Sequence, residues 1–275
     1  MNSRVAVMGG VALLVAAVAW WQLASPTRPE VVAFEDFGEK NLPLPPVPPR
    51  IAEGAEYERC LEMIDRDPVG AAAFADAWGG GDGAMHCRAL AQIAGGDPED
   101  GADALEALAK GSTAPAAARA TVYDQATEAW IIAGEPDRAY AAATAALALA
   151  PDDADRLIAR SAAASALDRS GDAIDDLNRA LELEPWRIDA LVQRAAVWRE
   201  TGKLDLARAD INHALALNPD HPDGLLERGI QRQRLGDQAG ARADWDRAIL
   251  LDPDSPTADL AQQNLALLDA GPAQR

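Results

Sequence analysis

The sequence has few of the residues on which catalytic and metal sites usually depend. Its 275 residues include only two cysteines and three histidines. The histidines, His86, His213 and His221, lie far apart and match no known spacing of metal ligands, so no metal site and no cofactor are expected. The acidic residues fall mostly at expected caps, turns and solvent faces, and no two stand out as an acid and a base. The sequence therefore predicts a protein that is not an enzyme.

Basic residues are also scarce. There are 25 lysines and arginines against 44 aspartates and glutamates, which gives a formal net charge of −19, and no basic run occurs. Binding to phosphates needs clustered Lys and Arg, so a nucleic-acid partner is excluded. No small-molecule substrate is expected either. Aromatic residues make up only 5% of the chain, and the abundant alanine suits closely packed helices.

One uncharged apolar run, residues 5–23, is long enough to cross a bilayer. Nineteen helical residues span about 28 Å, close to the thickness of a hydrocarbon core. Arg4 precedes the run and the first acidic residue is Glu30, so the N-terminus is expected in the cytoplasm and the rest outside a bacterial inner membrane, in the periplasm. The alternative is a signal peptide, cleaved at the small residues 17–19, which would release a soluble periplasmic protein.

A proline-rich linker is expected at residues 25–50. The stretch 41–50, NLPLPPVPPR, contains five prolines in ten residues. Such a sequence favours an extended polyproline II spacer of about 3.1 Å per residue, which would hold the following domain away from the membrane. A docking site for a proline-reading domain is the alternative interpretation.

The strongest pattern in the sequence is a period of 34 residues. Four prolines have this spacing, and each is preceded at fixed distances by an aliphatic residue, by two alanines and by a large residue further upstream. The columns are Pro151, Pro185, Pro219 and Pro253; Leu149, Leu183, Leu217 and Leu251; Ala146, Ala180, Ala214 and Ala248; Ala139, Ala173, Ala207 and Ala241; and Tyr123, Leu157, Leu191 and Leu225. Small residues let two helices approach closely, and the large residues fill the space between them.

Glycines mark the expected turn within each repeat. Gly134, Gly202 and Gly236 fall where a first helix must end in the left-handed conformation. The second repeat has Asp168 in this column and Gly171 three residues later, so we expect a differently shaped turn there.

These columns resemble tetratricopeptide repeats, which are helix–turn–helix units of 34 residues. The resemblance covers about residues 120–255, and it implies an all-α right-handed superhelix. In such proteins the first helix of each pair lines a concave face that binds peptides or protein segments. On this register, the resemblance places twelve residues in the groove: Asp124, Glu128, Ile131, Ile158, Ala162, Ser165, Val192, Ala196, Arg199, Leu226, Ile230 and Gln233. We expect about half of them to bind a partner, with Arg199 receiving a carboxylate, and the others to pack against the next repeat.

The rest of the chain is expected to extend the same α-solenoid. We predict five regions: an anchor or signal segment at 1–24, the linker at 25–50, two degenerate helical hairpins at 51–115, four regular repeats at 116–255, and a capping helix and tail at 256–275. In the hairpins, first helices are expected at 57–65 and 84–93 and second helices at 69–78 and 100–109, with Asp67 and Asp97 as caps. The glycine-rich stretch 79–83 is interpreted as a break, because it matches neither phosphate-binding pattern.

A capping helix is expected at 257–268, because the last repeat of a solenoid needs a cover. Leu260, Leu265, Leu267 and Leu268 are expected to cover the repeat.

Two charged columns accompany the repeats. Arg160, Arg194 and Arg228 share one column of the first helix, and Asp176, Asp210 and Asp244 share one column of the second. The first repeat has neither charge and carries Ala126 and Ala142 instead. Since the two charges occur together or not at all, we expect an ion pair within each of the last three repeats. A charged stripe that binds a partner is the alternative.

The two cysteines, Cys60 and Cys87, fall at comparable depths in neighbouring first helices. Outside the cytoplasm a disulfide is the natural interpretation, provided that the two positions face each other. The alternatives are two separately buried cysteines or a redox-active pair.

Together these features predict a non-enzymatic scaffold that binds a membrane or periplasmic protein in its groove and contacts the bilayer through residues 5–23. A soluble periplasmic chaperone or carrier, and a thiol-redox protein or enzyme regulator, are the alternative functions.

Overall fold

The computed structural model describes residues 49–271. The segment 5–23, the cleavage site at 17–19 and nearly all of the proline-rich linker lie outside these residues. Among residues 49–271, no helix is both long enough and apolar enough to cross a membrane.

Residues 49–271 form thirteen α-helices and no strand. Two helical pairs come first, followed by four more pairs and a final helix. Their bounds are α2 Ala55–Ile64, α3 Pro68–Trp78, α4 Asp82–Ala94, α5 Pro98–Gly111, α6 Ala116–Ala133, α7 Pro136–Leu149, α8 Ala154–Ala166, α9 Ser170–Leu183, α10 Ile188–Glu200, α11 Leu204–Leu217, α12 Pro222–Arg234, α13 Gln238–Leu251 and α14 Pro256–Ala270. We call the even-numbered helices α2 to α12 the first helices and the odd-numbered ones the second helices.

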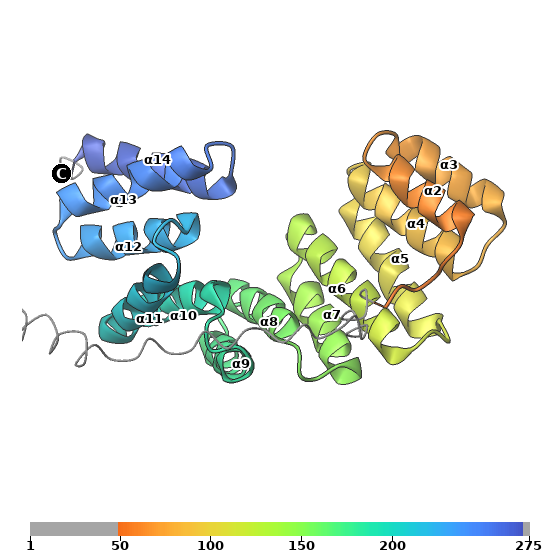
Figure 1. The fold of residues 1–275 in the computed structure, drawn as a ribbon, viewed down its shortest axis with the longest axis horizontal. Helices are drawn as coiled ribbons and strands as arrows, with labels where there is room; N and C mark the ends of the chain where they lie inside the picture. The colour runs from red at the N-terminus through yellow and green to blue at the C-terminus, as the bar shows by residue number, and fades with distance from the viewer. Residues whose placement is uncertain (1–48, 272–275) are drawn as a thin grey trace, which may run out of the picture. The chain divides into compact units, whose positions relative to one another are not determined.

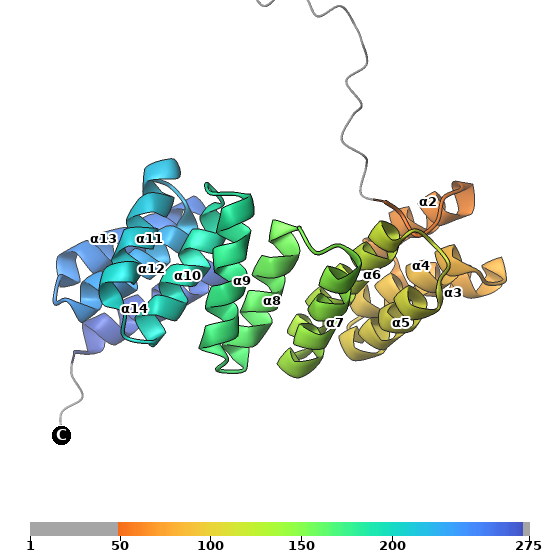
Figure 2. The same cartoon turned by 90° about the horizontal axis from the view of Figure 1, so that it is seen from below.

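Each helix packs against the next one along the chain, which is the arrangement of an α-solenoid (Figures 1 and 2). In addition, first helices lie beside one another: α6 contacts α8, α8 contacts α10, and α10 contacts α12. The first helix α2 contacts α4 in the same way, and α14 continues the series by packing against α12. The first helices therefore form a layer of neighbouring helices, with the second helices behind them.

The alanine columns lie at the contacts between helices. All eight alanines of the two columns are completely buried. Beside these alanines, a larger side chain on the second helix is matched by a smaller one on the first helix. Where the second helix carries Leu177, Ile211 or Trp245, the first helix carries Ser161, Ala195 or Gly229, respectively. A Cβ atom at Gly229 would lie 2.3 Å from Nε1 of Trp245, so only glycine fits beside this indole.

The turn of the second repeat has the same shape as the others, and the expectation of a different turn is wrong. Asp168 takes a left-handed φ of 57°, the conformation that Gly134, Gly202 and Gly236 take in the other repeats. The backbone N–H of Asp168 donates to Ser165 and that of Arg169 to Ala164, as the corresponding residues do in the other turns. Aspartate is one of the few residues that tolerate this conformation, so the fold keeps the turn without glycine.

The two ends of the stack differ from the expectation in detail. Asp67 caps α3 by accepting the N–H of Gly70, but the Asp97 side chain makes no such bond at α5. In α14, Leu265 and Leu268 pack beside Trp245, while Leu260 and Leu267 are exposed. The prediction that all four leucines cover the last repeat is therefore wrong for two of them, because the small residues Ala258 and Ala261 take the buried positions.

Candidate functional site

The strongest candidate for a binding site is the surface of α6 and α8. Two neighbouring depressions lie there, and both are lined by Ile131, whose side chain is 47% exposed. The first extends from Ile131 past Glu128 and Asp124 to Arg156 on α8. The second extends from Ile131 to Ala162 on α8 and to Pro136 in the turn after α6. Four of the twelve predicted groove residues therefore meet here: Asp124, Glu128, Ile131 and Ala162. We call this surface the Ile131 site.

The charges around the Ile131 site are predominantly acidic. Nε of Arg156 donates to the two carboxylate oxygens of Asp124 at 2.9 and 3.0 Å. Burial raises the pKa of Asp124 above its usual value, and the hydrogen bond from Arg156 opposes this rise. Asp155 is held by Arg187 on the next repeat, and Glu128 is exposed. The site thus presents an apolar centre beside an exposed carboxylate.

Not all of the predicted groove residues are available to a partner. Ile158 and Val192 are only 8% exposed and pack inside hydrophobic clusters, so they belong with the residues expected to pack and not with those expected to bind. Arg199 donates through Nε to Glu227 at 2.7 Å. Both of these charged side chains are mostly buried, so Arg199 is not a free receptor for a carboxylate.

The remaining predicted groove residues are half-buried along α8, α10 and α12. Leu226 and Ile230 pack against the cluster around Trp245. The others are Ser165, Ala196 and Gln233. They lie outside both depressions of the Ile131 site.

Polar contacts connect the layer of first helices from one helix to the next. Asp124 and Arg156 connect α6 to α8, and Arg199 and Glu227 connect α10 to α12. Further contacts join Ser161 to Gln193 at 3.0 Å between α8 and α10, His86 to Gln125 at 2.6 Å between α4 and α6, and Thr257 to Asp223 between α14 and α12. We call these contacts the first-helix bridges. Sequence reasoning missed them because their residues differ at each step and follow no column.

Burial shifts the pKa of Glu227 and of His86, as it does that of Asp124. The pKa of Glu227 is raised by burial, which the hydrogen bond from Arg199 partly offsets. The pKa of His86 is lowered from its usual 6.5 by burial, which its hydrogen bond with Gln125 partly offsets. Its other ring nitrogen, Nδ1, lies 2.6 Å from the hydroxyl of Tyr57, and burial raises the pKa of that hydroxyl to about 12. The imidazole and the hydroxyl are therefore mainly neutral at pH 7.

The charged columns form ion pairs within the repeats. Arg160 contacts Asp176 at 2.6 Å, and the pairs Arg194–Asp210 and Arg228–Asp244 have the same separation of 2.7 Å. Each arginine donates through two nitrogens to both carboxylate oxygens, and the three aspartates are buried. Each arginine pairs with an aspartate of its own repeat, and the three carboxylates are buried between the two helices. The arrangement therefore favours ion pairs within the repeats over a charged stripe that binds a partner.

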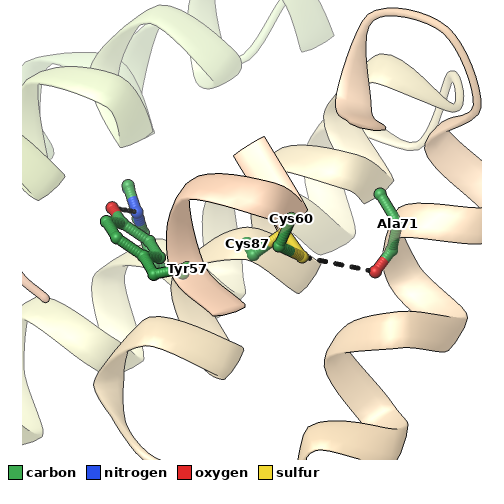
Figure 3. The surroundings of a disulfide bond; sticks show 5 residues. Tyr57, Cys60, Ala71 and Cys87 are labelled. Atoms are coloured by element: carbon green, nitrogen blue, oxygen red, sulfur yellow. Dashed lines mark hydrogen bonds between the residues drawn. A yellow bond between two sulfur atoms is a disulfide. The ribbon is translucent and has the colours of Figure 1, made fainter. Parts of the chain in front are cut away.

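The two cysteines face each other from α2 and α4 (Figure 3). Their sulfur atoms are bonded in the structure and their Cα atoms are 6.1 Å apart. Both residues are completely buried among Ala71, Ala75 and Ala91. Since exchange requires attack by a thiolate on an accessible sulfur, this burial argues against a redox-active pair.

Within residues 49–271, no group of histidine, cysteine, aspartate and glutamate side chains could hold a metal ion. The buried side-chain nitrogen and oxygen atoms of the same residues all have hydrogen-bond partners.

Comparison with known proteins defines the fold. No protein-family model and no curated protein matches the chain. Among solved structures, TTC0263, a thermophilic TPR protein of Thermus thermophilus, is 19% identical over 68% of this chain and 100% of its own, with a TM-score of 0.55. The APC/C hetero-tetramer Cut9–Hcn1 is similar over 76% of this chain and 45% of its own, with 15% identity and a TM-score of 0.54.

MamA shares the same architecture, with 17% identity over 62% of this chain and 92% of its own and a TM-score of 0.51. At such low identities these likenesses concern the fold alone. The chain has the fold of a tetratricopeptide-repeat protein, an all-helical solenoid of paired helices.

Proposed function

We propose that this chain is a non-enzymatic interaction scaffold that binds a segment of a partner protein at the Ile131 site. The observation that carries the proposal is the pair of adjoining depressions that share one exposed isoleucine on the first-helix layer. Buried apolar anchors contribute most of the affinity of protein interfaces, and an amphipathic helix or extended peptide can supply the matching side chain.

The first-helix bridges support this proposal. A surface that is already fixed before binding loses less conformational entropy when a partner docks. Asp124 and Arg156 hold α6 against α8, which are the two helices that form the Ile131 site. The bridge therefore keeps the two walls of the site in place in the unbound chain.

The location on the periplasmic side of a bacterial inner membrane is also a proposal. It is supported by the uncharged run at residues 5–23 and by the positions of Cys60 and Cys87, since disulfides persist in oxidising compartments. The expected observation is that the chain, taken from cells quenched with acid and then alkylated in denaturant without a reductant, carries no label on either cysteine. Labelling of both cysteines would reject an oxidising location.

The binding proposal is tested by affinity capture from membranes with the intact chain and two matched variants. Ile131→Ser copies Ser165, the residue that the next repeat carries in the same column, so the fold tolerates it. Ile132→Ala copies Ala166 and changes an exposed isoleucine that lines neither depression. The proposal predicts a membrane or periplasmic partner that is captured by the native chain and by Ile132→Ala and lost with Ile131→Ser. Equal capture by all three proteins would reject the Ile131 site.

A further inference from the structure

Another depression lies at the turn between α10 and α11, where α12 ends, and it shares no residue with the Ile131 site. We call it the α11–α12 depression. Its lining residues come from the turn, from the first two turns of α11 and from the end of α12: Gly202, Leu204, Asp205, Arg208, Gln231, Arg234 and Leu235. Leu204 is 43% exposed and Leu235 is 65% exposed. Both leucines therefore present apolar surface at the rim of a concave feature, where a partner can cover it.

The corresponding positions of the preceding repeats carry different residues, so the combination of leucines and arginine is specific to the α11–α12 depression. Shifting each residue by one period places Ser170, Glu200 and Thr201 where the α11–α12 depression has Leu204, Arg234 and Leu235. One period further back, the same three positions are occupied by uncharged residues, namely Pro136, Ala166 and Leu167. Of these three repeats, only the one at α11–α12 carries two leucines and an arginine at these positions.

The charge of the depression is opposite to that of the chain. Arg208 contacts Asp205 at 2.8 Å, but both side chains are exposed, and exposed pairs of this kind contribute little stability, so a partner can open the pair. Among the described residues, no carboxylate lies within ion-pair distance of Arg234. The lining thus contains two cations, Arg208 and Arg234, and one carboxylate, Asp205, which is already paired with Arg208.

The high negative charge of the whole chain does not cancel this local field. Charges are screened over about 8 Å at physiological ionic strength, so the field at the depression is set by the nearest groups. An arginine without an internal partner binds carboxylates through two parallel hydrogen bonds, and the neighbouring leucines bury an apolar side chain.

We propose that the α11–α12 depression is a second docking surface, which takes an acidic segment of a partner protein with an apolar side chain beside its carboxylates. The apolar side chain packs between Leu204 and Leu235, and a carboxylate pairs with Arg234. This surface is separate from the Ile131 site, so the scaffold can hold two segments at once, one beside the exposed Glu128 and one beside Arg234.

The test is selection of a random twelve-residue peptide library, displayed on phage, against the intact chain in detergent. One variant, Leu204→Ser with Arg234→Glu and Leu235→Thr, copies the residues of the preceding repeat at these positions. A matched control, Leu206→Asp, copies Asp172 and changes an exposed leucine that does not line the depression. The proposal predicts peptides rich in Asp or Glu with one or two large apolar residues. These peptides are expected to bind the triple variant at least tenfold more weakly and the control within twofold of the native chain.

Three outcomes of the peptide experiment would overturn the proposal: selection of basic peptides or of none, equal binding of the selected peptides to the triple variant, or loss of binding in Ile131→Ser. Circular dichroism checks that each variant is folded. If the triple variant unfolds, the single variant Arg234→Glu is tested instead. Reversing this one charge should weaken the binding of the acidic peptides at least fivefold. If light scattering shows that the native chain dimerises and Arg234→Glu does not, the surface binds a second copy of the chain and the proposal is rejected.

Discussion

We expect the replacement Asp176→Ala to lower the free energy of unfolding by about 2–3 kcal/mol. Nε and Nη2 of Arg160 donate to the two oxygens of this carboxylate at 2.8 and 2.6 Å. Removing one partner from a fully buried pair costs roughly 3–5 kcal/mol, while an exposed pair is worth roughly 0–1 kcal/mol. Asp176 is buried, but 22% of the Arg160 side chain remains exposed. Water can therefore reach part of the guanidinium, and the expected cost falls between the two limits.

The first repeat supplies the control for this prediction. It has Ala126 and Ala142 in the two columns, and both are buried. The double variant Arg160→Ala with Asp176→Ala copies this arrangement and leaves no unpaired charge. We expect it to be more stable than the sum of the two single changes by at least about 1.5 kcal/mol, because residues in contact are not additive. Urea unfolding followed by circular dichroism measures all four proteins. A loss below about 0.5 kcal/mol in Asp176→Ala, or additivity within about 0.5 kcal/mol, would refute this account of the ion pairs.

Three further changes test other parts of the fold. Asp168→Gly should raise the free energy of unfolding by about 0.5–1 kcal/mol in urea titration, since glycine takes the left-handed turn without steric cost; a decrease would contradict the assignment of the turn. Gly229→Ala should lower the free energy of unfolding by about 1–3 kcal/mol, because its Cβ would clash with the indole, and adding Trp245→Ile should recover part of the loss; a neutral effect would contradict the reciprocal packing. The pKa of His86 is lowered in the folded chain, so the stability present above pH 6.5 should fall as the pH drops below 6.5, by at most about 1.4 kcal/mol per pH unit. His86→Gln should remove this dependence between pH 7.5 and 5.5, and an unchanged slope would assign it to another group.

The repeat architecture could be predicted because its determinants recur with a fixed period. A residue such as Ala139 is completely buried in the first repeat, and its counterparts are equally buried in the following three. The arginine and aspartate columns were similarly informative, because each pair is closed within one repeat and so returns with it. Residues that recur with the period indicate contacts that recur from one repeat to the next.

The binding surface was less predictable, because it depends on residues that differ between repeats. The column of Ile131 contains Ser165, Arg199 and Gln233, and only Ile131 is both apolar and exposed. The sequence did not say which of the twelve residues would pack instead of bind; Ile158 packs in a hydrophobic cluster that includes residues of the next first helix. No sequence pattern indicated that Arg199 would pair with Glu227, since this bridge joins two repeats at positions where the others carry different residues.

The most direct test of the scaffold account is site-specific photo-cross-linking in the intact chain, expressed in its own cells. A benzophenone amino acid is placed at position 131 in one protein and at position 132 in the other, since both side chains are exposed but only Ile131 lines the two depressions. The account predicts a cross-link from position 131 to a defined segment of one partner protein, identified by mass spectrometry, and no such product from position 132. The same product from both positions, or none from position 131, would contradict the central claim that the Ile131 site binds the partner.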